Sequence, residues 1–356
     1  MVGIPLQSQN FFIACYLISL FQGETILGHK IKAHTIKHCY SAALLLFKER
    51  SLICPRRARV DYISLVYKAI LQYEQVPNRR NMITDAMMHE IHKAATGVHP
   101  DSLPAVLKDW YSLARYSGFR RSEWCQKSQT DYQRITERLA GWEGPDSQAL
   151  IFEDFVFYGE GERRIHDIRR VSVDDIVSVG VCWRNQKNGD NGQVIVYVRD
   201  LDRPDFCPVL ASYNIAMRAY RLKVPKLEPV AVFLSNQGKR LFVTDKMVAT
   251  SLQAAAMQAH NLKPEDPELK KWTSHSLRVT AACLLHRAKC SDSYIQTRLS
   301  WKSTSFLMYV RNTIYTAEAH TKALHLSTNN IPHIRQIGDN RQPPGPHDIL
   351  WTAAAA

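Results

Sequence analysis

The stretch that decides the fold is 273–313, which reads Thr-Ser-His-Ser-Leu-Arg at Thr273–Arg278, Leu-Ser-Trp at Leu299–Trp301 and Tyr-Val-Arg-Asn at Tyr309–Asn312. On a helix, a His and an Arg three residues apart lie on one face, one turn from each other. Trp301 follows Arg278 by 23 residues and Tyr309 follows Trp301 by eight. An HxxR pair alone is weak evidence, because any basic helix can carry one. The ordered set is much more specific.

Two segments upstream extend this set. Gly118-Phe119-Arg120-Arg121-Ser122-Glu123 follows a helical pattern and offers Arg120 with Glu123 three residues later. Lys187 stands at the entrance of the polar turn Lys187–Gly192, between the β-rich stretches 176–184 and 193–199. Asn and Gly at this place predict a β-hairpin.

Together these motifs resemble the tyrosine recombinases, the phage integrase family, over about residues 8–326. Lys187-Asn188-Gly189 and Cys207-Pro208-Val209 are similar to the eukaryotic Crypton-like mobile-element branch. The resemblance implies a site-specific DNA recombinase or integrase that cleaves and rejoins strands through a 3′-phosphotyrosine. It implies these catalytic residues: Arg120, Lys187, His275, Arg278 and Trp301, with Tyr309 as the nucleophile and Glu123 as an orienting group.

The chemistry explains why such residues are needed. Phosphodiester transfer builds negative charge on the phosphate oxygens, and Arg120 and Arg278 can clamp that charge bidentately. A tyrosine hydroxyl has a pKa near 10, so it needs a base, for which His275 is the candidate. Lys187 would protonate the leaving 5′-oxygen, and Trp301 offers an indole N–H donor. We expect neither a metal nor an organic cofactor, and no small-molecule substrate.

The charge balance favours a polyanionic partner. Lys and Arg number 46 against 33 Asp and Glu, for a net charge of +13 and a pI near 9.4. Nucleic acid is the first expectation and an anionic membrane the second. A membrane-surface protein is discounted because no long amphipathic basic helix is present. The resemblance to tyrosine recombinases narrows this expectation to double-stranded DNA, bound by a homotetramer across two sites.

Other features predict an intracellular protein, nuclear in a eukaryote and cytoplasmic in a bacterium. The apolar run Phe11–Phe21 is too short for a bilayer span, which takes about 20 residues, so it predicts a buried helix instead. The eight cysteines are scattered without a CxxC pair. They are expected to be reduced thiols, several of them buried in apolar runs, with no zinc site.

Periodicity predicts a mainly α fold with a small antiparallel β-sheet, of the α+β class. Residues 1–78 are expected to form a helical core-binding domain, SAM-like by resemblance, that binds DNA. Residues 79–330 are expected to form the catalytic domain, and 331–356 a disordered tail rich in proline. By resemblance, the helix around Thr316–Leu326 is expected to dock into a neighbouring protomer.

Two alternatives stay open. The spacing from Trp301 to Tyr309 is one residue short of the family pattern, and Ser300 replaces the usual Gly. Both departures are compatible with a decayed or domesticated DNA-binding protein that no longer cleaves. A type IB topoisomerase is less favoured, because Ser305-Phe306-Leu307-Met308 lacks the Ser-Lys-x-x-Tyr pattern of that class.

Overall fold

The computed structural model describes residues 4–24, 28–50, 53, 58–74, 79–129, 148–184, 186, 191–310 and 321–324. The chain divides into two compact units, Met1–Asn78 and Arg79–Ala356. Helices and short antiparallel strands make up the fold, so the prediction of a mainly α, α+β class is confirmed. Among the described residues, no helix is long and apolar enough to cross a bilayer.

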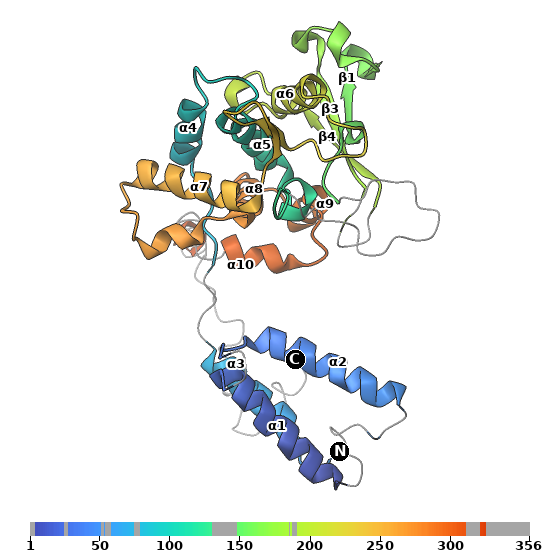
Figure 1. Cartoon of the computed structure of the whole chain (residues 1–356), viewed down its shortest axis with the longest axis vertical. Helices are drawn as coiled ribbons and strands as arrows, with labels where there is room; N and C mark the ends of the chain where they lie inside the picture. Colours follow the sequence, from blue (N-terminus) through green and yellow to red (C-terminus); the bar gives the residue numbers. More distant parts are fainter. Residues whose placement is uncertain are drawn as a thin grey trace, which may run out of the picture. The chain divides into compact units, whose positions relative to one another are not determined.

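The first unit consists of three helices, α1 (Leu6–Gln22), α2 (Ala33–Glu49) and α3 (Tyr62–Tyr73) (Figure 1). Its core is a small set of aliphatic side chains: Ala14, Leu17, Leu20, Ala33, Ile36, Ile63 and Ile70. Asp61 caps α3 by accepting a hydrogen bond from the backbone N–H of Ser64 at 3.2 Å. The capping carboxylate satisfies a donor that the helix itself leaves unpaired.

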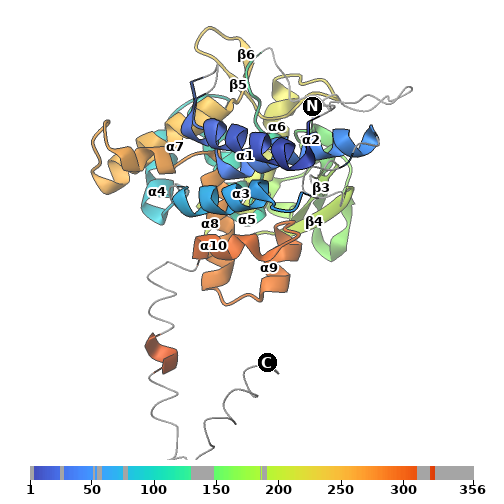
Figure 2. The ribbon, with the colours of Figure 1, turned by 90° about the horizontal axis from the view of Figure 1, so that it is seen from below.

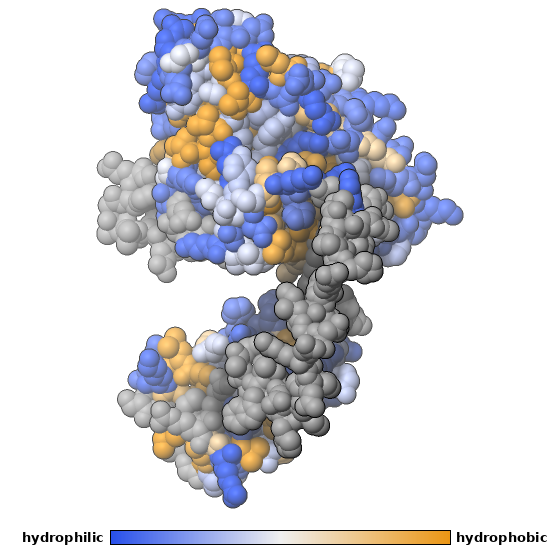
Figure 3. Space-filling view, turned by 180° about the vertical axis from the view of Figure 1, so that it is seen from behind, coloured by the Kyte–Doolittle hydropathy of each residue, from blue (hydrophilic) through white to orange (hydrophobic). Residues whose placement is uncertain are grey.

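The segment Phe11–Phe21 is helical, as predicted, but only one face of the helix, with Ala14, Leu17 and Leu20, is buried. Phe11, Phe12 and Tyr16 are 50%, 56% and 61% exposed, and Cys15 and Cys39, two of the thiols of this unit, are exposed too. In a unit of three helices, each helix buries only the face that it turns toward the other two. The opposite face of α1 therefore remains outside the core. Orange, apolar atoms accordingly lie on the surface of this unit in Figure 3.

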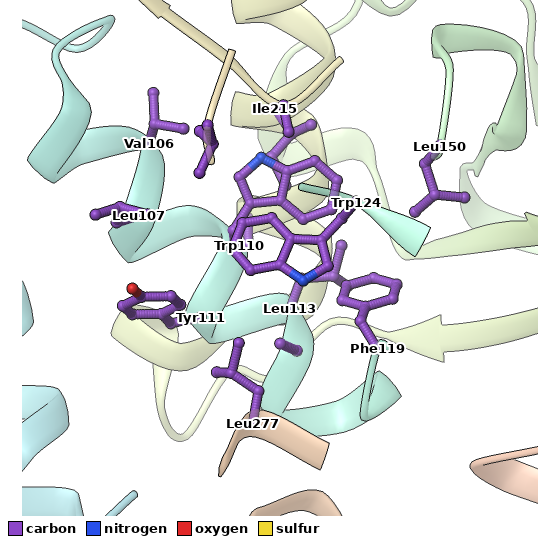
Figure 4. Packing of buried hydrophobic residues seen from close by; sticks show 14 of the residues in the cluster. Val106, Leu107, Trp110, Tyr111, Leu113, Phe119, Trp124, Leu150, Ile215 and Leu277 are labelled. Atoms are coloured by element: carbon purple, nitrogen blue, oxygen red, sulfur yellow. The ribbon is translucent and has the colours of Figure 1, made fainter. Parts of the chain in front are cut away.

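The second unit begins with two helices. They are α4 (Asp85–Ala94), which Thr84 caps, and α5 (Leu103–Ser117). Helix α5 is buried on nearly every side, and the indoles of Trp110 and Trp124 stack with ring centres 5.0 Å apart (Figure 4). Gly118 ends α5 with φ of +58°, a left-handed conformation that favours glycine. A Cβ there would lie 3.2 Å from side-chain atoms of Ala281 and Leu299, so the chain turns closely against its neighbours.

A four-stranded antiparallel sheet follows, in the order β2-β1-β3-β4. Its strands are β1 (Phe155–Tyr158), β2 (Arg164–Ile165), β3 (Ser178–Trp183) and β4 (Gln193–Val198). Strands β3 and β4 form the predicted hairpin, with Val179 opposite Tyr197 on the buried face. A second sheet pairs β5 (Val232–Leu234) with β6 (Arg240–Phe242) and was not predicted.

The remaining helices are α6 (Pro208–Arg221), α7 (Asp245–His260), α8 (Ser274–Arg287), α9 (Asp292–Arg298) and α10 (Leu307–Val310). Short 3₁₀ helices lie at Arg121–Glu123 (η2), Phe152–Asp154, Glu160–Glu162, Ile168–Arg170 (η5), Val173–Asp175, Pro204–Phe206, Pro267–Lys271 and Thr304–Phe306 (η9). In Figures 1 and 2, α8 lies against α5, and α9 and α10 in turn contact α8. Buried Cys283 on α8 lies in the apolar run where a buried thiol is expected.

Candidate active site

Six of the seven predicted site residues meet where α8, α9, α10 and η2 adjoin. Helix α8 carries His275 and Arg278 one turn apart, as the HxxR spacing predicts. The remaining members of this group are Arg120 before η2, Glu123 within it, Trp301 after α9 and Tyr309 on α10. The seventh predicted residue, Lys187, lies outside the described residues.

His275 and Tyr309 form the central pair of the site. His275 Nε2 lies 2.9 Å from Tyr309 Oη, a hydrogen-bond distance. Burial lowers the pKa of His275, as do the neighbouring guanidiniums of Arg278 and Arg80. The neutral imidazole is therefore favoured, and in the tautomer that leaves Nε2 unprotonated it accepts the phenol proton. This geometry suits a general base next to its nucleophile.

The pKa of Tyr309 results from opposing influences. Burial raises it, and the positive charges of Arg278, Arg79 and Arg80 act in the opposite direction. Burial is the larger influence, so the phenol is protonated at rest. A phenolate that forms during attack would be stabilised by the same three guanidiniums.

Arg278 is held by the carboxyl ends of two helices. Its guanidinium donates to the carbonyl of Gly118 at 2.8 Å and to the carbonyl of Leu299 at 2.8 Å. These carbonyls end α5 and α9, and unpaired helix-terminal carbonyls favour cations. Burial and the nearby charge of Arg120 lower the pKa of Arg278 to about 10, so it remains protonated at neutral pH. Its Nε–H has no acceptor among the described residues and is available to a ligand.

Arg120 is held by the carboxylate of Glu123 and by a carbonyl at the carboxyl end of α9. Its Nη1 donates to Glu123 Oε1 at 2.8 Å, and its Nη2 donates to the carbonyl of Ser300 at 2.9 Å. Glu123 is 5% exposed, and its other oxygen accepts from the backbone N–H of Arg120 at 2.5 Å. The buried carboxylate thus orients the guanidinium, the role that the sequence predicts for it.

The end of α9 explains why a small residue precedes Trp301. The N–H of Trp301 donates to the carbonyl of Gln296 at 2.9 Å, the long-range bond of a Schellman motif. Ser300 is the left-handed residue of this motif, with φ of +52°. The conformation suits glycine, and serine adopts it at a cost. The turn directs Trp301 back onto the site.

Replacing Ser300 by glycine is expected to raise the free energy of unfolding of this unit by about 0.5–1 kcal/mol, because glycine relieves left-handed strain. All seven tryptophans lie at position 110 or later, so their fluorescence in a urea titration reports on this unit alone. Ser293→Gly, within α9, is the control and is expected to lower the same quantity by about 0.5–1 kcal/mol. A loss of stability in Ser300→Gly would contradict the strain argument.

Trp301 packs between a cation and the nucleophile. Its ring lies under Arg278, 4.4 Å from the guanidinium carbon, and meets the Tyr309 ring edge to face with centres 6.3 Å apart. Its indole N–H is buried and has no acceptor among the described residues. An unpaired buried donor beside the Arg278 guanidinium is suited to an incoming oxygen anion.

The short spacing between Trp301 and Tyr309 is accommodated by a tight connection. The 3₁₀ helix η9 runs directly into α10, and Phe306 between them is fully buried. Tyr309 nevertheless reaches His275. The missing residue is therefore no obstacle to a close contact between nucleophile and base.

Two residues next to the nucleophile were missed from the sequence. Arg79 donates to the carbonyl of Met308, and Arg80 contributes to the electrostatic field at both His275 and Tyr309. In the sequence they are the first two residues of the expected catalytic domain, 79–330, directly after Pro77-Asn78, and no motif marks them. Consecutive arginines in such a segment were the available signal.

In the part of the chain that the structure describes, the site combines guanidiniums with a single carboxylate, that of Glu123, so it favours an anion. Among the described residues, no group of three His, Cys, Asp or Glu side chains is placed to hold a metal ion. The buried Arg278, the partly exposed Arg120, an unpaired indole N–H and a tyrosine with its base form an arrangement that can bind a phosphate and attack it.

Comparisons with known proteins identify similar structures. No family model matches the sequence, and no curated protein matches it. The Tn1549 transposon integrase in complex with circular intermediate DNA is 14% identical, with 89% of this chain and 86% of that chain covered and a TM-score of 0.44. XerA recombinase is 16% identical (89% and 90% covered, TM-score 0.37). A lambda integrase dimer bound to a core site is 15% identical (87% and 90% covered, TM-score 0.36).

These proteins are recombinases or integrases, the class whose motifs the sequence resembles.

Proposed function

We propose that this protein is a DNA strand-transferase of the tyrosine recombinase type. Tyr309 Oη attacks a backbone phosphorus, a bond from phosphorus to the tyrosine oxygen forms, and the bond to the 5′-oxygen breaks. The 3′-phosphotyrosine then retains the energy of the phosphodiester, and a 5′-hydroxyl of another strand reverses the step. The hydrogen bond of 2.9 Å between His275 and Tyr309, beside the buried guanidinium of Arg278, is the observation that carries this proposal.

The arginines stabilise the charge that develops on the phosphate. Arg278 and Arg120 are already oriented by carbonyls and by Glu123, so little reorganisation is needed when the transition state forms. Trp301 adds its indole N–H as a further donor. Because these groups are fixed by helix ends, they act as a preorganised anion site.

Protons move at two places in the proposed reaction. His275 takes the phenol proton as Tyr309 attacks, and the imidazolium returns it when the tyrosine leaves. Lys187 supplies a proton to the departing 5′-oxygen, which is otherwise a poor leaving group. Since the guanidiniums provide the positive charge and phosphotyrosine conserves the bond energy, the mechanism requires neither a metal nor a nucleotide cofactor.

Double-stranded DNA is the proposed partner, consistent with the net charge of +13. The affinity of the protein for DNA should fall steeply as the salt concentration rises, because each phosphate contact releases counterions from the DNA. In the proposed assembly, four protomers act on two sites. The helix expected around Thr316–Leu326 as the contact between protomers lies mostly outside the described residues and stays a prediction.

The deciding experiment is a suicide-substrate assay. A pool of nicked duplexes of random sequence is incubated with the protein without metal, and covalent adducts are resolved on a denaturing gel. Wild type is expected to form an adduct that Tyr309→Phe does not form. Tyr294→Phe, an exposed tyrosine of α9, is the matched control and should retain it.

Salt-sensitive binding without any adduct, on a duplex shown to be bound, would instead indicate a DNA-binding protein that has lost cleavage. Relaxation of supercoiled plasmid without exchange of strands would indicate a topoisomerase.

The pH dependence of adduct formation should report on His275. Its pKa lies below the ordinary 6.5, so the neutral, active imidazole persists as the pH falls through 6.5, and the rate should decline only at lower pH. Single-turnover rates measured between about pH 5 and 8 give the acidic limb of the pH–rate profile, the range in which the rate declines as His275 is protonated. The Arg80→Gln variant should shift the limb toward higher pH, because one positive neighbour of His275 is removed. A limb above pH 6.5 in wild type would contradict the assignment.

A further inference from the structure

A cavity of about 640 Å³ adjoins Tyr309 in the second unit. Three cationic side chains line it, those of Arg79, Arg80 and Lys271, and Tyr309 forms part of its wall. No carboxylate belongs to its described lining. The Lys271 ammonium pairs with Glu268 outside that lining, so the two guanidiniums are its uncompensated charges.

The segment 79–84 is fastened along the catalytic unit by backbone hydrogen bonds. Asn81 N–H donates to the carbonyl of Lys271 at 3.1 Å, and Ile83 N–H donates to Thr280 Oγ1 at 2.7 Å. The indole of Trp272 donates to the carbonyl of Met82 at 3.1 Å. The guanidiniums at the start of the segment are therefore held at fixed positions beside the nucleophile.

Each guanidinium is oriented by a carbonyl and not by an acid. Arg79 Nη1 donates to the carbonyl of Met308 at 3.0 Å, and Arg80 Nη1 donates to the carbonyl of Lys270 at 2.6 Å. Neither arginine pairs with a carboxylate in the part of the chain that the structure describes. A guanidinium has five N–H donors, so most of those on each remain for a ligand.

We propose that this cavity is a second phosphate subsite, which binds the DNA phosphate next to the scissile one through Arg79 and Arg80. The inference rests on the proposed function, since Tyr309 is the wall shared by the two sites. Successive phosphates of one strand are close neighbours, so a duplex that presents one phosphate to Tyr309 brings the next to the cavity. A phosphate held by Arg79 is also linked through Met308 to α10, so Arg79 is a positioning residue for the nucleophile.

The test pairs protein charges with individual DNA phosphates. A duplex selected for binding from a random pool is prepared with single neutral methylphosphonates at every position in turn. Affinity for wild type and for the Arg79→Gln/Arg80→Gln variant of the full chain is measured by fluorescence anisotropy. Arg169→Gln/Arg170→Gln is the control, because it removes another pair of consecutive arginines, on η5, that does not line the cavity.

In wild type, neutralising the subsite phosphate is expected to weaken binding about tenfold, as for a charge-assisted contact. In Arg79→Gln/Arg80→Gln, the same neutralisation should have no further effect, whereas in the control variant it keeps its full effect. Arg79→Lys/Arg80→Lys should restore part of the affinity, which excludes misfolding as the cause.

If each methylphosphonate weakened binding to the same extent in wild type and in Arg79→Gln/Arg80→Gln, the proposed subsite would be ruled out. The methylphosphonate experiment measures DNA binding alone, so it can support the subsite even when no covalent adduct forms. The adduct gel, in turn, can support the proposed function even when the methylphosphonates show no coupling to Arg79 and Arg80. Where an adduct does form, its position identifies the scissile phosphate. The coupled phosphate must then be its neighbour, and coupling at a distant phosphate would also overturn the proposal.

Discussion

Replacing Arg278 by lysine is expected to lower the rate of adduct formation by about 10²- to 10³-fold, the cost of removing one preorganised donor to a transition-state oxygen. The guanidinium binds two helix-end carbonyls, and its Nε–H has no acceptor among the described residues. An ammonium offers a single point of charge and cannot satisfy both carbonyls in this fork geometry. Affinity for DNA should change far less, because many phosphate contacts share it.

The arginine at this position is 4% exposed, so the substitution also affects stability. A carbonyl left without its donor costs about 1–3 kcal/mol. Tryptophan fluorescence therefore establishes first that the variant is folded at the assay temperature. Single-turnover adduct formation on a saturating nicked duplex then measures the chemical step. A rate within threefold of wild type would contradict the proposed role of Arg278.

A substrate with a sulfur leaving group distinguishes the proposed role of Arg278 from that of Lys187. When sulfur replaces the bridging 5′-oxygen, the leaving group is a thiolate, which is far less basic than an alkoxide (a cysteine thiol has a pKa near 8.5) and departs without a proton donor. Lys187→Ala should lose activity on the oxygen substrate and regain it on the sulfur substrate. Arg278→Lys should remain slow on both, because it lacks charge stabilisation and not a proton. Equal rescue of both variants would contradict the division of roles.

The elements with strong local signals were predictable from the sequence. Helix α5 spans Leu103–Ser117, as periodicity and the following Gly118 predict, because a glycine after the last turn adopts the left-handed cap. The β3–β4 hairpin follows from two β-rich runs around Lys187–Gly192. The HxxR spacing placed His275 and Arg278 together, since helix geometry alone fixes that relation.

Other features depend on contacts that leave no local trace. Arg79 lies 229 residues from Met308 in the sequence, and its hydrogen bond there follows from the tertiary fold. The exposure of Phe11 depends on how few helices surround α1, which its own apolar pattern does not encode. The β5–β6 hairpin has strands of only three residues, too short for an alternating pattern. Its turn, Asn236-Gln237-Gly238, was the one available signal.

Replacing Asp109 by alanine is expected to lower the free energy of unfolding of the second unit by about 3 kcal/mol, the lower end of the cost of removing one partner of a buried ion pair, because Arg218 keeps a second carboxylate, that of Asp101, at 3.6 Å. Asp109 and Arg218 are 3% and 2% exposed, and Arg218 Nη2 donates to Asp109 Oδ2 at 2.5 Å. Arg218 also donates to the carbonyl of Pro100 at 2.9 Å, which ties α6 to the loop before α5. Without the carboxylate, the guanidinium would remain buried beside an unfilled space.

Urea titration followed by tryptophan fluorescence measures this loss, with Glu90→Ala as the control. Glu90 pairs with exposed Lys93 at 3.9 Å, so its removal should cost less than about 1 kcal/mol. The double variant Asp109→Leu/Arg218→Met removes both charges and should lose less than the sum of the single losses, because no unpaired charge remains. Additive losses would show that Asp109 stabilises the unit through packing alone. A loss in Asp109→Ala as small as that in Glu90→Ala would show that the guanidinium finds water or another acceptor.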